Sequence, residues 1–475
     1  MSVSTAKAIH NEATDAQFVR MTQEPIRKLL IQMGIPTVIS MMVTSVYNIG
    51  DTYFVSQLGT SASGGVSTAL PVQAIIQAMG FMLGMGSGSQ ISRLLGAKKV
   101  EESEKIAVSG FFAAITFGVI IAVFGLLNME WVLTMLRATP TIRPYCREYL
   151  SIILFGAPIM AGSFVLNNIL RSQGNAKFAM VGISTGAILN LFLDPLFIFG
   201  LDMGIAGAAL ATVVSQCISF FLLLGAFLIG KSAVKLRLRR ISLSPVLHFR
   251  TISNGFPSFV RQALSSIATI LLNGAAAEYG DGAVAAMGIV GKVFMIIFAV
   301  GLGIGQGYMP VLGYNYGAKQ YKRVRESLKF TLGLGTCLMT GMGIIIGIFA
   351  PYIIKAFIAD NPIVVEVGTA ALRAQCISLP LLAMGVVSNM TYQTIGKSFI
   401  ASLLSSARQG IFYIPMILIL PRVIGLTGVE ITQSAADVLT FVLCVPFVVS
   451  FLRKMKKEEM KAAEENLPVA EETTA

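Results

Sequence analysis

The chain alternates long apolar runs with short polar stretches. The hydrocarbon core of a bilayer is about 30 Å thick, so a membrane-spanning helix needs about 20 apolar residues. The runs that meet this length are too long and too uniformly apolar to be the strands of a barrel. We therefore predict an all-α membrane protein with twelve transmembrane helices, near 30–56, 64–92, 106–128, 149–170, 177–200, 204–229, 251–276, 284–312, 328–350, 367–392, 399–420 and 426–452.

Composition supports this interpretation. Of the 475 residues, 55% are hydrophobic and only 13% are charged, whereas a soluble domain carries about 25% charged residues. A cytosolic enzyme, a secreted disulfide scaffold and a nucleic-acid-binding domain are therefore excluded. The lipid bilayer is the expected partner, and the net charge of +12 does not indicate a nucleic acid, because the basic residues lie in short loops between the apolar runs.

The basic residues also orient the chain. Lys and Arg number 27 on the side of the two termini and five on the other side, with four inside the spans. The positive-inside rule therefore places both termini in the cytoplasm and the protein in the cell membrane, as a multi-pass inner-membrane protein. Residues 1–28 are polar and lack the pattern of a signal peptide, so we expect a cytoplasmic tail there.

The two halves of the chain resemble each other. A shift of 221 residues superposes glycines and prolines of the first half on those of the second, and a shift of 222 continues the match. Each half has six spans, so the repeats are parallel and related by a pseudo-twofold axis along the membrane normal. We predict an N-lobe (29–230), a C-lobe (251–453) and a charged tail (454–475). A basic cytoplasmic stretch (231–250) links the lobes; its alternative role is a lipid-headgroup site.

Signatures of soluble enzymes occur in the wrong context. A phosphate-loop pattern (225–232), a hydrolase elbow (182–186) and a glycine run (301–307) all lie in or at the end of spans, where glycines serve helix packing. The five cysteines are scattered, and His10 and His248 have no second ligand nearby. We expect no enzyme, no cofactor and no metal centre beyond a possible Na⁺, and an ion gradient rather than ATP as the energy source.

Two aspartates lie well inside spans, Asp51 and Asp194. A carboxylate there costs about 2.5–3.5 kcal/mol, which favours a water-filled cavity or a bound cation. Tyr47 and Asn190 each precede one of these acids by four residues and share its helix face. Pro195 frees a carbonyl one turn away. This set of oxygens suits Na⁺, and the same acids could hold a proton; the alternative is an interhelical hydrogen bond or a misplaced span boundary.

The second half differs at these positions, because Leu272 and Met416 stand opposite the two acids. Its intramembrane charges are mainly basic: Arg261, Lys292, Arg373 and Arg408, with Glu430 and Asp437 on the last span. The basic residues could snorkel, pair with the two acids, or line an anion-tolerant cavity. Methionines adapt to many ligand shapes, so we expect a substrate cavity bordered by Met79, Met82, Met287 and Met295, with Arg261 and Lys292.

In combination, several motifs resemble the multidrug and toxic compound extrusion (MATE) family over about 25–452. They are 47–55 (YNIGDTYFV), the Gly-Ala-Lys turns at 96–98 and 317–319, 171–175 (RSQGN), 190–195 (NLFLDP) and 204–212 (GIAGAALAT). The resemblance implies two six-helix lobes that export drug-like compounds in exchange for Na⁺ or H⁺. It also implies a cation site at Asp51, Asn190, Asp194 and Thr212, with Tyr47 and Asn167 adjacent. Some family members carry acids on helices 7 and 10, where this chain has Arg261 and Arg373.

The sequence as a whole therefore predicts a cation-coupled (Na⁺ or H⁺) antiporter that exports amphipathic drug-like or toxic organic compounds by alternating access. We expect small-molecule substrates and a monomer. The runner-up is a lipid-linked oligosaccharide flippase of the wider superfamily, which the basic C-lobe favours. A membrane-bound enzyme would need catalytic polar residues at the bilayer surface, and the sequence contains no such cluster.

Overall fold

The computed structural model describes residues 14–230, 232–242, 244–358 and 360–465, and long helices account for most of them. Those of the first half are α2 (Ile26–Ser56), α3 (Thr60–Gly96), α4 (Val100–Leu127), α6 (Arg143–Ser172), α7 (Ala176–Pro195) with the π-helical turn η1 (Leu196–Gly200), and α8 (Gly204–Leu228). Those of the second half are α9 (Pro245–Ala277), α10 (Asp281–Gly317), α11 (Tyr321–Phe357), α12 (Pro362–Thr394), α13 (Ser398–Ser406) continued by η3 (Ala407–Ile411) and α14 (Tyr413–Ile424), and α15 (Leu426–Glu465). A short helix, α5 (Met129–Met135), follows α4.

All twelve predicted spans correspond to helical segments. In the described part of the chain, eleven segments are long and apolar enough to cross a membrane by length and composition. The twelfth is α9, which has the length of its neighbours but carries more polar residues along its middle, among them Ser258, Arg261, Gln262 and Ser265. The twelve-helix architecture is therefore confirmed, and α9 is its most polar member.

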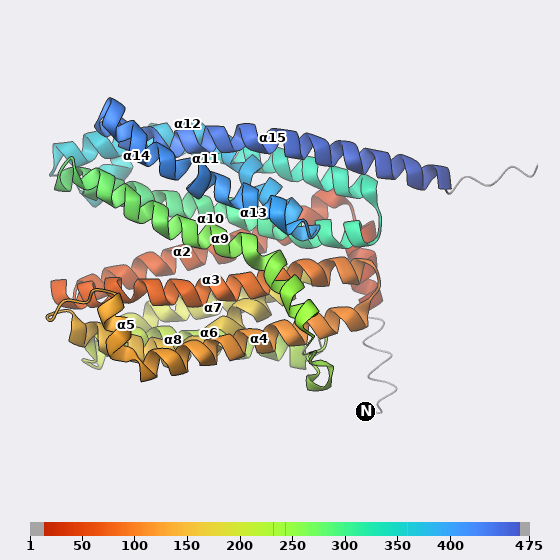
Figure 1. Cartoon of the computed structure of the whole chain (residues 1–475), viewed down its shortest axis with the longest axis horizontal. Helices are drawn as coiled ribbons and strands as arrows, with labels where there is room; N and C mark the ends of the chain where they lie inside the picture. The colour runs from red at the N-terminus through yellow and green to blue at the C-terminus, as the bar shows by residue number, and fades with distance from the viewer. Residues whose placement is uncertain (1–13, 231, 243, 359, 466–475) are drawn as a thin grey trace, which may run out of the picture.

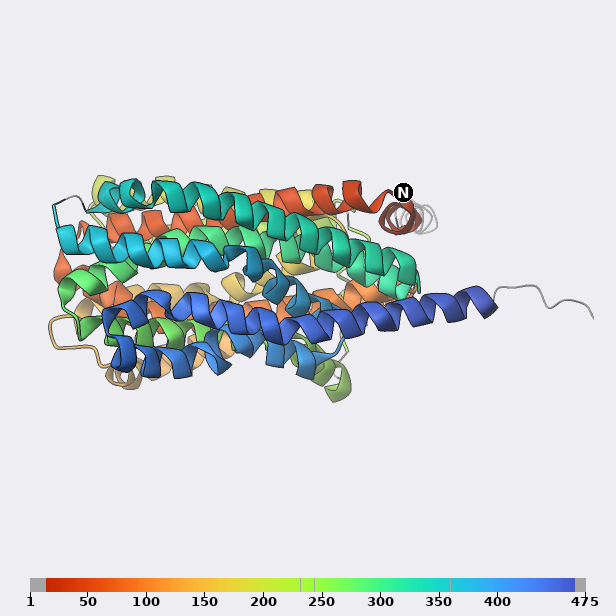
Figure 2. The ribbon, with the colours of Figure 1, turned by 90° about the horizontal axis from the view of Figure 1, so that it is seen from above.

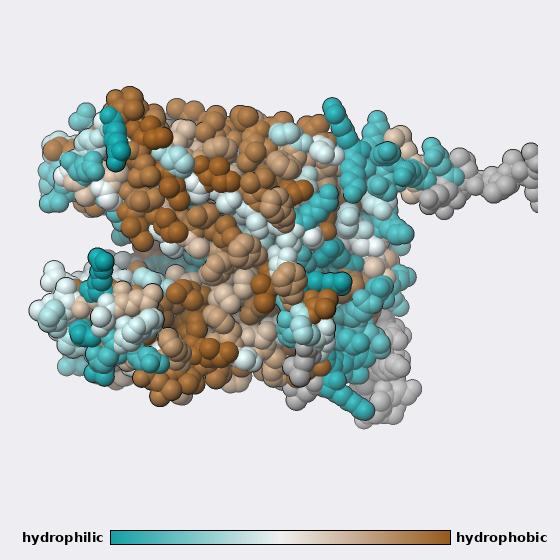
Figure 3. Space-filling view, in the orientation of Figure 1, coloured by the Kyte–Doolittle hydropathy of each residue, from teal (hydrophilic) through white to brown (hydrophobic). Residues whose placement is uncertain are grey.

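The helices form two bundles that lie side by side along a common axis (Figure 1). The helices run roughly along this axis, and α15 extends beyond the other helices at one end (Figure 2). A broad apolar belt covers the middle of the visible face, and hydrophilic residues gather at both ends (Figure 3). At the end away from the start of α2 and the end of α15, the surface between the bundles is hollowed (Figure 3). We call this the open end and the opposite one the closed end.

The backbone repeats itself at the predicted offsets. Residues with positive φ angles recur in pairs: Gly59 (97°) and Gly280 (92°), Lys98 (60°) and Lys319 (57°), Gly174 (89°) and Gly396 (82°), and Gly204 (52°) and Gly425 (65°). Positive φ is uncommon for residues other than glycine, so the matching lysines in the two Gly-Ala-Lys turns are a specific sign of duplication. The turns between helices are thus conserved between the halves even where the side chains differ.

Glycines let the two bundles approach each other near the closed end. A Cβ atom on Gly307 of α10 would lie 2.7 Å from Cα of Gly34 on α2, and one on Gly86 of α3 would lie 3.0 Å from the amide nitrogen of Gly255 on α9. The offset of 221 residues exchanges these two contacts. The bundles therefore meet across a pseudo-twofold interface, and small residues permit backbone-to-backbone packing there.

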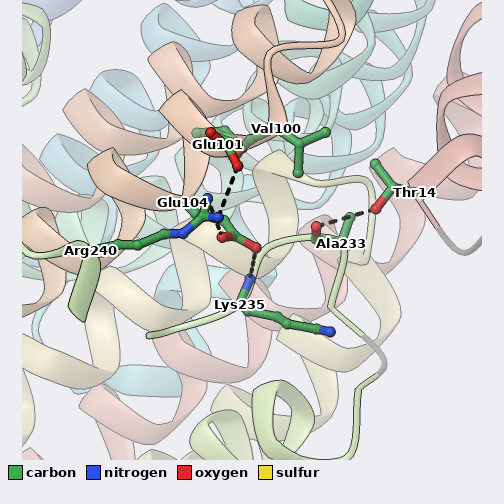
Figure 4. Close-up of polar contacts among 8 residues, drawn as sticks. Thr14, Val100, Glu101, Glu104, Ala233, Lys235 and Arg240 are labelled. Atoms are coloured by element: carbon green, nitrogen blue, oxygen red, sulfur yellow. Dashed lines mark hydrogen bonds and ion pairs between the residues drawn. The ribbon is translucent and has the colours of Figure 1, made fainter. Parts of the chain in front are cut away.

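The stretch that connects the bundles is attached to the first of them (Figure 4). Arg240 forms ion pairs with Glu101 (3.1 Å) and the buried Glu104 (2.8 Å) at the start of α4. The amide of Lys235 donates to Glu104 (3.2 Å). Residues 245–250, which we expected in the linker, form the first turns of α9, and the expected charged tail continues α15 as far as residue 465. Residues 466–475, residues 1–13 and therefore His10 lie outside the described residues.

Candidate functional site

The two predicted acids come together inside the first bundle. Asp51 lies near the end of α2 and Asp194 at the end of α7, and their carboxyl groups are close enough to interact electrostatically. Asp194 is fully buried, with 0% of its surface exposed, and Asp51 is partly buried. Tyr47 on α2 and Tyr149 on α6 lie within electrostatic range of both acids. We call these four residues, with Asn190 and Thr212, the acid cluster.

Hydrogen bonds satisfy only part of the acid cluster. The amide nitrogen of Asn190 donates to one carboxylate oxygen of Asp194 (3.2 Å) and lies 3.5 Å from the hydroxyl of Thr212 on α8. Four oxygens remain buried with no hydrogen-bond partner among the described residues: Oδ1 of Asp51, Oδ1 of Asn190, Oδ2 of Asp194 and the hydroxyl of Tyr149. Buried polar atoms normally find a partner. The cluster is therefore built to receive a positively charged or hydrogen-donating guest.

No basic side chain compensates this negative charge. No ion pair within 4.0 Å joins Asp51 or Asp194 to a Lys, Arg or His of the described chain. An isolated buried carboxylate costs several kcal/mol in lost hydration. Two carboxyl groups in one enclosed space add mutual repulsion, so a proton or a metal cation between them lowers the energy. Hard oxygen ligands of this kind suit Na⁺ and protons equally.

The local sequence explains how the two helices bring the acids together. Gly50 precedes Asp51, and a side chain there would overlap Leu191 of α7, so the absence of a Cβ permits close packing of α2 on α7. Pro195 follows Asp194 and ends the regular hydrogen bonding of α7, after which η1 begins at Leu196. Such π-turns are frequent at functional sites. The helix thus changes from α- to π-helical hydrogen bonding directly beside Asp194; the freed carbonyl that we expected from Pro195 stays a prediction.

Asn167 has a different place from the one that the resemblance implied. Its side-chain nitrogen donates to the backbone oxygen of Ala179 (2.9 Å) and ties α6 to α7. The repeat-related Asn389 makes the same bond to Ala401 (2.7 Å) in the second bundle. Because the bond occurs in both halves and only one half has the acids, Asn167 holds the helix pair together. Tyr149 is the member of the acid cluster that the sequence did not identify.

A cavity of about 490 Å³ lies in the second bundle, between α9, α10, α12, η3 and α15, with Phe81 of α3 at its boundary. Its wall includes three basic residues, Arg261, Lys292 and Arg408, and no acidic one. Met287 and Met295 line it as predicted, whereas Met79 and Met82 do not contribute to its wall. Met82 is instead buried where its backbone meets Gly255 of α9.

Among the other intramembrane charges of this bundle, Arg408, Asp437 and Arg373 have partners, whereas Glu430 has no basic residue within 4.0 Å in the described part of the chain. Nε of Arg408, in η3, donates to Asp437 (2.7 Å), and Gln433 (3.0 Å) and Ser378 (3.3 Å) also donate to that carboxylate. The guanidinium stacks over Phe294 and Phe298 at 4.8 and 4.9 Å. Outside the cavity, Nε of Arg373 donates to the backbone oxygen of residue 347 (3.3 Å).

Comparisons with known proteins identify the family. The MatE family model matches residues 36–196 and 257–419, one match in each bundle. The "Multidrug export protein MepA" of Staphylococcus haemolyticus is 26% identical over 440 residues, which cover 92% of this chain and 96% of that protein.

Solved structures agree over the same length. One, described as the outward-facing conformation of a multidrug resistance MATE family transporter of the MOP superfamily, is 26% identical, covers 92% of this chain and 98% of its own, and has a TM-score of 0.88. A MOP superfamily transporter from Pyrococcus furiosus, described as having a binding pocket of reverse polarity, has the same identity and coverage and a TM-score of 0.86. With two family matches, one in each of two six-helix bundles, this chain belongs to the MatE family of membrane transporters.

Proposed function

We propose that this chain is a cation-coupled antiporter that exports amphipathic organic compounds across the cell membrane, with Na⁺ or H⁺ as the coupling ion. The relatives named as multidrug export proteins support export as the direction of transport. These relatives match over most of the chain and are named as exporters rather than as flippases, so the exporter is the function that we favour.

The acid cluster carries this proposal. Its four unpartnered oxygens lie inside an apolar bundle, where a cation from either side of the membrane would neutralise the two carboxylates. One ion that moves through 100 mV releases about 2.3 kcal/mol. This free energy suffices to sustain a substrate concentration ratio of several tens across the membrane. Enclosure within one bundle keeps the cation apart from an organic substrate bound elsewhere.

The position of α2 suggests how ion binding affects the whole molecule. This helix contacts α7 next to the acid cluster, at Gly50 and Leu191, and contacts α10 of the other bundle at Gly34 and Val38. A cation between Asp51 and Asp194 would draw α2 toward α7 and thereby change its contact with α10. Ion binding would then bias the equilibrium between outward- and inward-open states.

The orientation follows from charge. Most loop lysines and arginines lie at the closed end, together with the start of α2 and the end of α15, so this end faces the cytoplasm. The hollow between the bundles then opens to the outside, and the structure corresponds to the outward-open state, in which an exporter releases its substrate and accepts its coupling ion.

Reconstituted transport tests the proposal. Purified protein is reconstituted into liposomes that are preloaded with a fluorescent dye. A Na⁺ gradient and a pH gradient are then imposed across the liposome membrane in separate experiments. We expect D51N and D194N each to reduce gradient-driven dye export at least tenfold, because a carboxamide neither binds Na⁺ as a charged ligand nor releases a proton. The gradient that drives the wild-type protein identifies the ion.

A matched control is E430Q, which also replaces a buried intramembrane carboxyl group but lies on α15, away from the acid cluster and the cavity. This variant should export at the wild-type rate. Undiminished export by both aspartate variants, in protein that is as monodisperse and heat-stable as the wild type, would contradict the proposed coupling site.

A further inference from the structure

We infer that the cavity of the second bundle binds amphipathic organic anions: a carboxylate, sulfonate or phosphate group on an apolar body. This inference names the substrate class of the proposed exporter, and it depends on the proposed function only in that the bound anions are then exported. The binding itself follows from the cavity. Three features of its wall point to this class: its net charge, the partners of its basic residues, and its apolar surface.

The charge of the wall is positive and partly uncompensated. Asp437 neutralises Arg408, the most deeply placed of the three basic residues, with 8% of its surface exposed. Arg261 and Lys292 have no carboxylate within 4.0 Å among the described residues, and the one polar contact of Arg261 is with the sulfur of Met85, at 4.0 Å. The cavity therefore presents about two positive charges to its contents.

The two uncompensated residues are well placed to share one ligand. Arg261 lies on the polar stripe of α9 and Lys292 on α10, and both line the same cavity. Neither is near a helix end, since Lys292 stands eleven residues into α10 and Arg261 sixteen residues into α9, so neither can snorkel to the headgroups. Lys292 is exposed and Arg261 is partly buried, so a ligand in the cavity can contact both cations, and an anionic ligand would compensate the charge that they carry at this depth.

Arg408 adds a donor to this arrangement. Its Nη2 atom is buried and has no hydrogen-bond partner among the described residues, although Asp437 holds its Nε atom. The guanidinium is fixed by Phe294 and Phe298. A planar guanidinium with a free N–H suits an oxyanion. Asp437 thus orients Arg408 and cancels its charge, while the free donor stays available to a ligand.

The remaining wall suits the apolar part of an amphiphile. Phe81, Phe294, Phe298, Met287, Met295 and Leu302 supply aromatic and flexible apolar surface. A volume of about 490 Å³ lies in the usual range for drug-sized ligands, about 300–1,000 Å³. An organic cation would meet the same apolar surface but would be repelled by Arg261 and Lys292, since the wall has no carboxylate to pair with it.

A charge-matched pair of probes tests this inference. Dansylglycine carries a carboxylate and dansylcadaverine an ammonium group on the same fluorophore, and binding is measured by fluorescence with wild-type protein in phosphatidylcholine nanodiscs. We expect dansylglycine to bind at least tenfold more tightly. K292Q and R261Q should each weaken its binding about tenfold, K292E should weaken it further and favour dansylcadaverine, and added salt should weaken it in the wild-type protein.

The control is K355Q, which removes an exposed lysine of α11 that is not part of the cavity wall and should leave both affinities unchanged. Lys292 is exposed, so its replacement does not disturb the core. Tighter binding of dansylcadaverine to the wild-type protein, or dansylglycine binding that is insensitive to both R261Q and K292Q, would overturn the inference.

A second arm distinguishes a free amphiphile from a lipid. Short-chain phosphatidylglycerol, added as a competitor, displaces dansylglycine if an anionic lipid headgroup is the natural source of the charge; displacement by octanesulfonate but not by the lipid indicates a soluble amphiphile. Either result supports an anion site. If neither competitor displaces dansylglycine, the inference is contradicted. The assay needs no ion gradient, so it can succeed while D51N and D194N disprove the coupling mechanism, and the reverse also holds.

Discussion

Two buried charged sites, one in each bundle, differ in how their charge is balanced. Arg408 and Asp437 form an ion pair whose carboxylate also accepts hydrogen bonds from two further side chains. The charges of such a pair balance each other, and breaking it by removing one partner typically costs about 3–5 kcal/mol. Asp51 and Asp194 have no such partner. This difference supports a structural role for Arg408 and Asp437 and is the reason for our proposal that Asp51 and Asp194 bind the coupling ion.

The hydroxyl of Tyr149 gives a test at the level of a single atom. It is buried beside both acids and has no hydrogen-bond partner among the described residues. Replacement in Y149F should therefore leave the melting temperature of the ion-free protein unchanged. If the hydroxyl completes the cation site, the affinity for the coupling ion should fall about fivefold, the equivalent of roughly 1 kcal/mol. The ion-induced rise in melting temperature measures this affinity.

Tyr308 provides the matched control for this prediction. Tyr308 lies in the second bundle, and its side chain is equally buried, but its hydroxyl is 3.3 Å from the hydroxyl of Thr391 in the same bundle. Y308F should lower the melting temperature of the ion-free protein, because it breaks a buried hydrogen bond, and should not change ion affinity. A loss of stability without a loss of ion affinity in Y149F would remove Tyr149 from the cation site.

The sequence identified most residues of the acid cluster but not this tyrosine. Asp51 and Asp194 are conspicuous because acids are costly in apolar runs, and Asn190 is found from them by helical spacing. Tyr149 comes from a different helix, α6, and a tyrosine near a span end is ordinary. Asn167 was placed beside the site by resemblance, whereas its bond to Ala179 recurs in the second bundle and serves the fold.

At the level of the helix, composition predicted the number of spans better than their internal geometry. Apolar runs located all twelve, because each must cross the bilayer. The interruption after Pro195 was predictable, since proline cannot continue the hydrogen bonding. The π-helical turn η3, which presents Arg408 to the cavity, contains no proline. Pro415 nevertheless lies four residues after Ile411, the last residue of η3, and cannot donate a hydrogen bond to its carbonyl. A local signal for an irregular helix is therefore present here too, but it does not specify a π-helical turn.

The glycine contact between α2 and α10 yields a prediction for a pair of helices. A methyl group on Gly307 would overlap the backbone of Gly34, so G307A should force the two bundles apart at the closed end. We expect a larger share of molecules open at that end, and an altered export rate. A cysteine is introduced at Thr251 of α9, which is buried at the closed end against Gln90 of α3, in a background without the native cysteines. Its labelling by a membrane-impermeant maleimide added to that side measures the opening.

G301A on the same helix is the control. A methyl group there would meet only the ends of the Met339 and Leu382 side chains, at ordinary distances of 3.7 and 3.8 Å, and should change neither labelling nor export. Equal labelling of G307A and the unmodified background would show that the closed end tolerates separation of α2 and α10 without opening, and that this glycine contact does not limit the conformational equilibrium.

The molecule as a whole divides its buried charge between its two bundles. The acid cluster is enclosed in the first bundle, and the basic cavity lies in the second, at the border of the hollow between them. Duplication supplied equal scaffolds, as the paired backbone angles show, and the side chains then diverged. A cation and an anionic amphiphile can therefore occupy one protein without competing for a site, so their coupling must pass through the interface between the bundles.

That interface also contains hydrogen bonds that must break if the bundles rock. Arg171 of α6 donates to Gln306 of α10 (2.5 Å), and Arg93 of α3 donates to the backbone oxygen of Ile395 (3.0 Å). Gln306 also lines the cavity, so a ligand that contacts its side chain would lie next to the hydrogen bond that Arg171 donates across the interface. These polar contacts and the glycine packing act together with a large apolar core at the closed end, to which both bundles contribute, for example Leu30 and Met33 of α2 and Val311 of α10.

Rigid-body rocking of the bundles predicts opposite changes at the two ends. Spin labels at Gln57 and Glu278 report across the open end, and labels at Glu102 and Lys397 across the closed end; the five native cysteines are first replaced. The ion that drives export should shorten the first distance and lengthen the second in the same fraction of molecules, because one hinge motion couples both ends. Pulsed dipolar spectroscopy in nanodiscs measures both distributions. A third pair within the first bundle, Glu102 and Lys177, should keep its distance, and a change there comparable to that across the closed end would mean that the bundles deform instead of rocking.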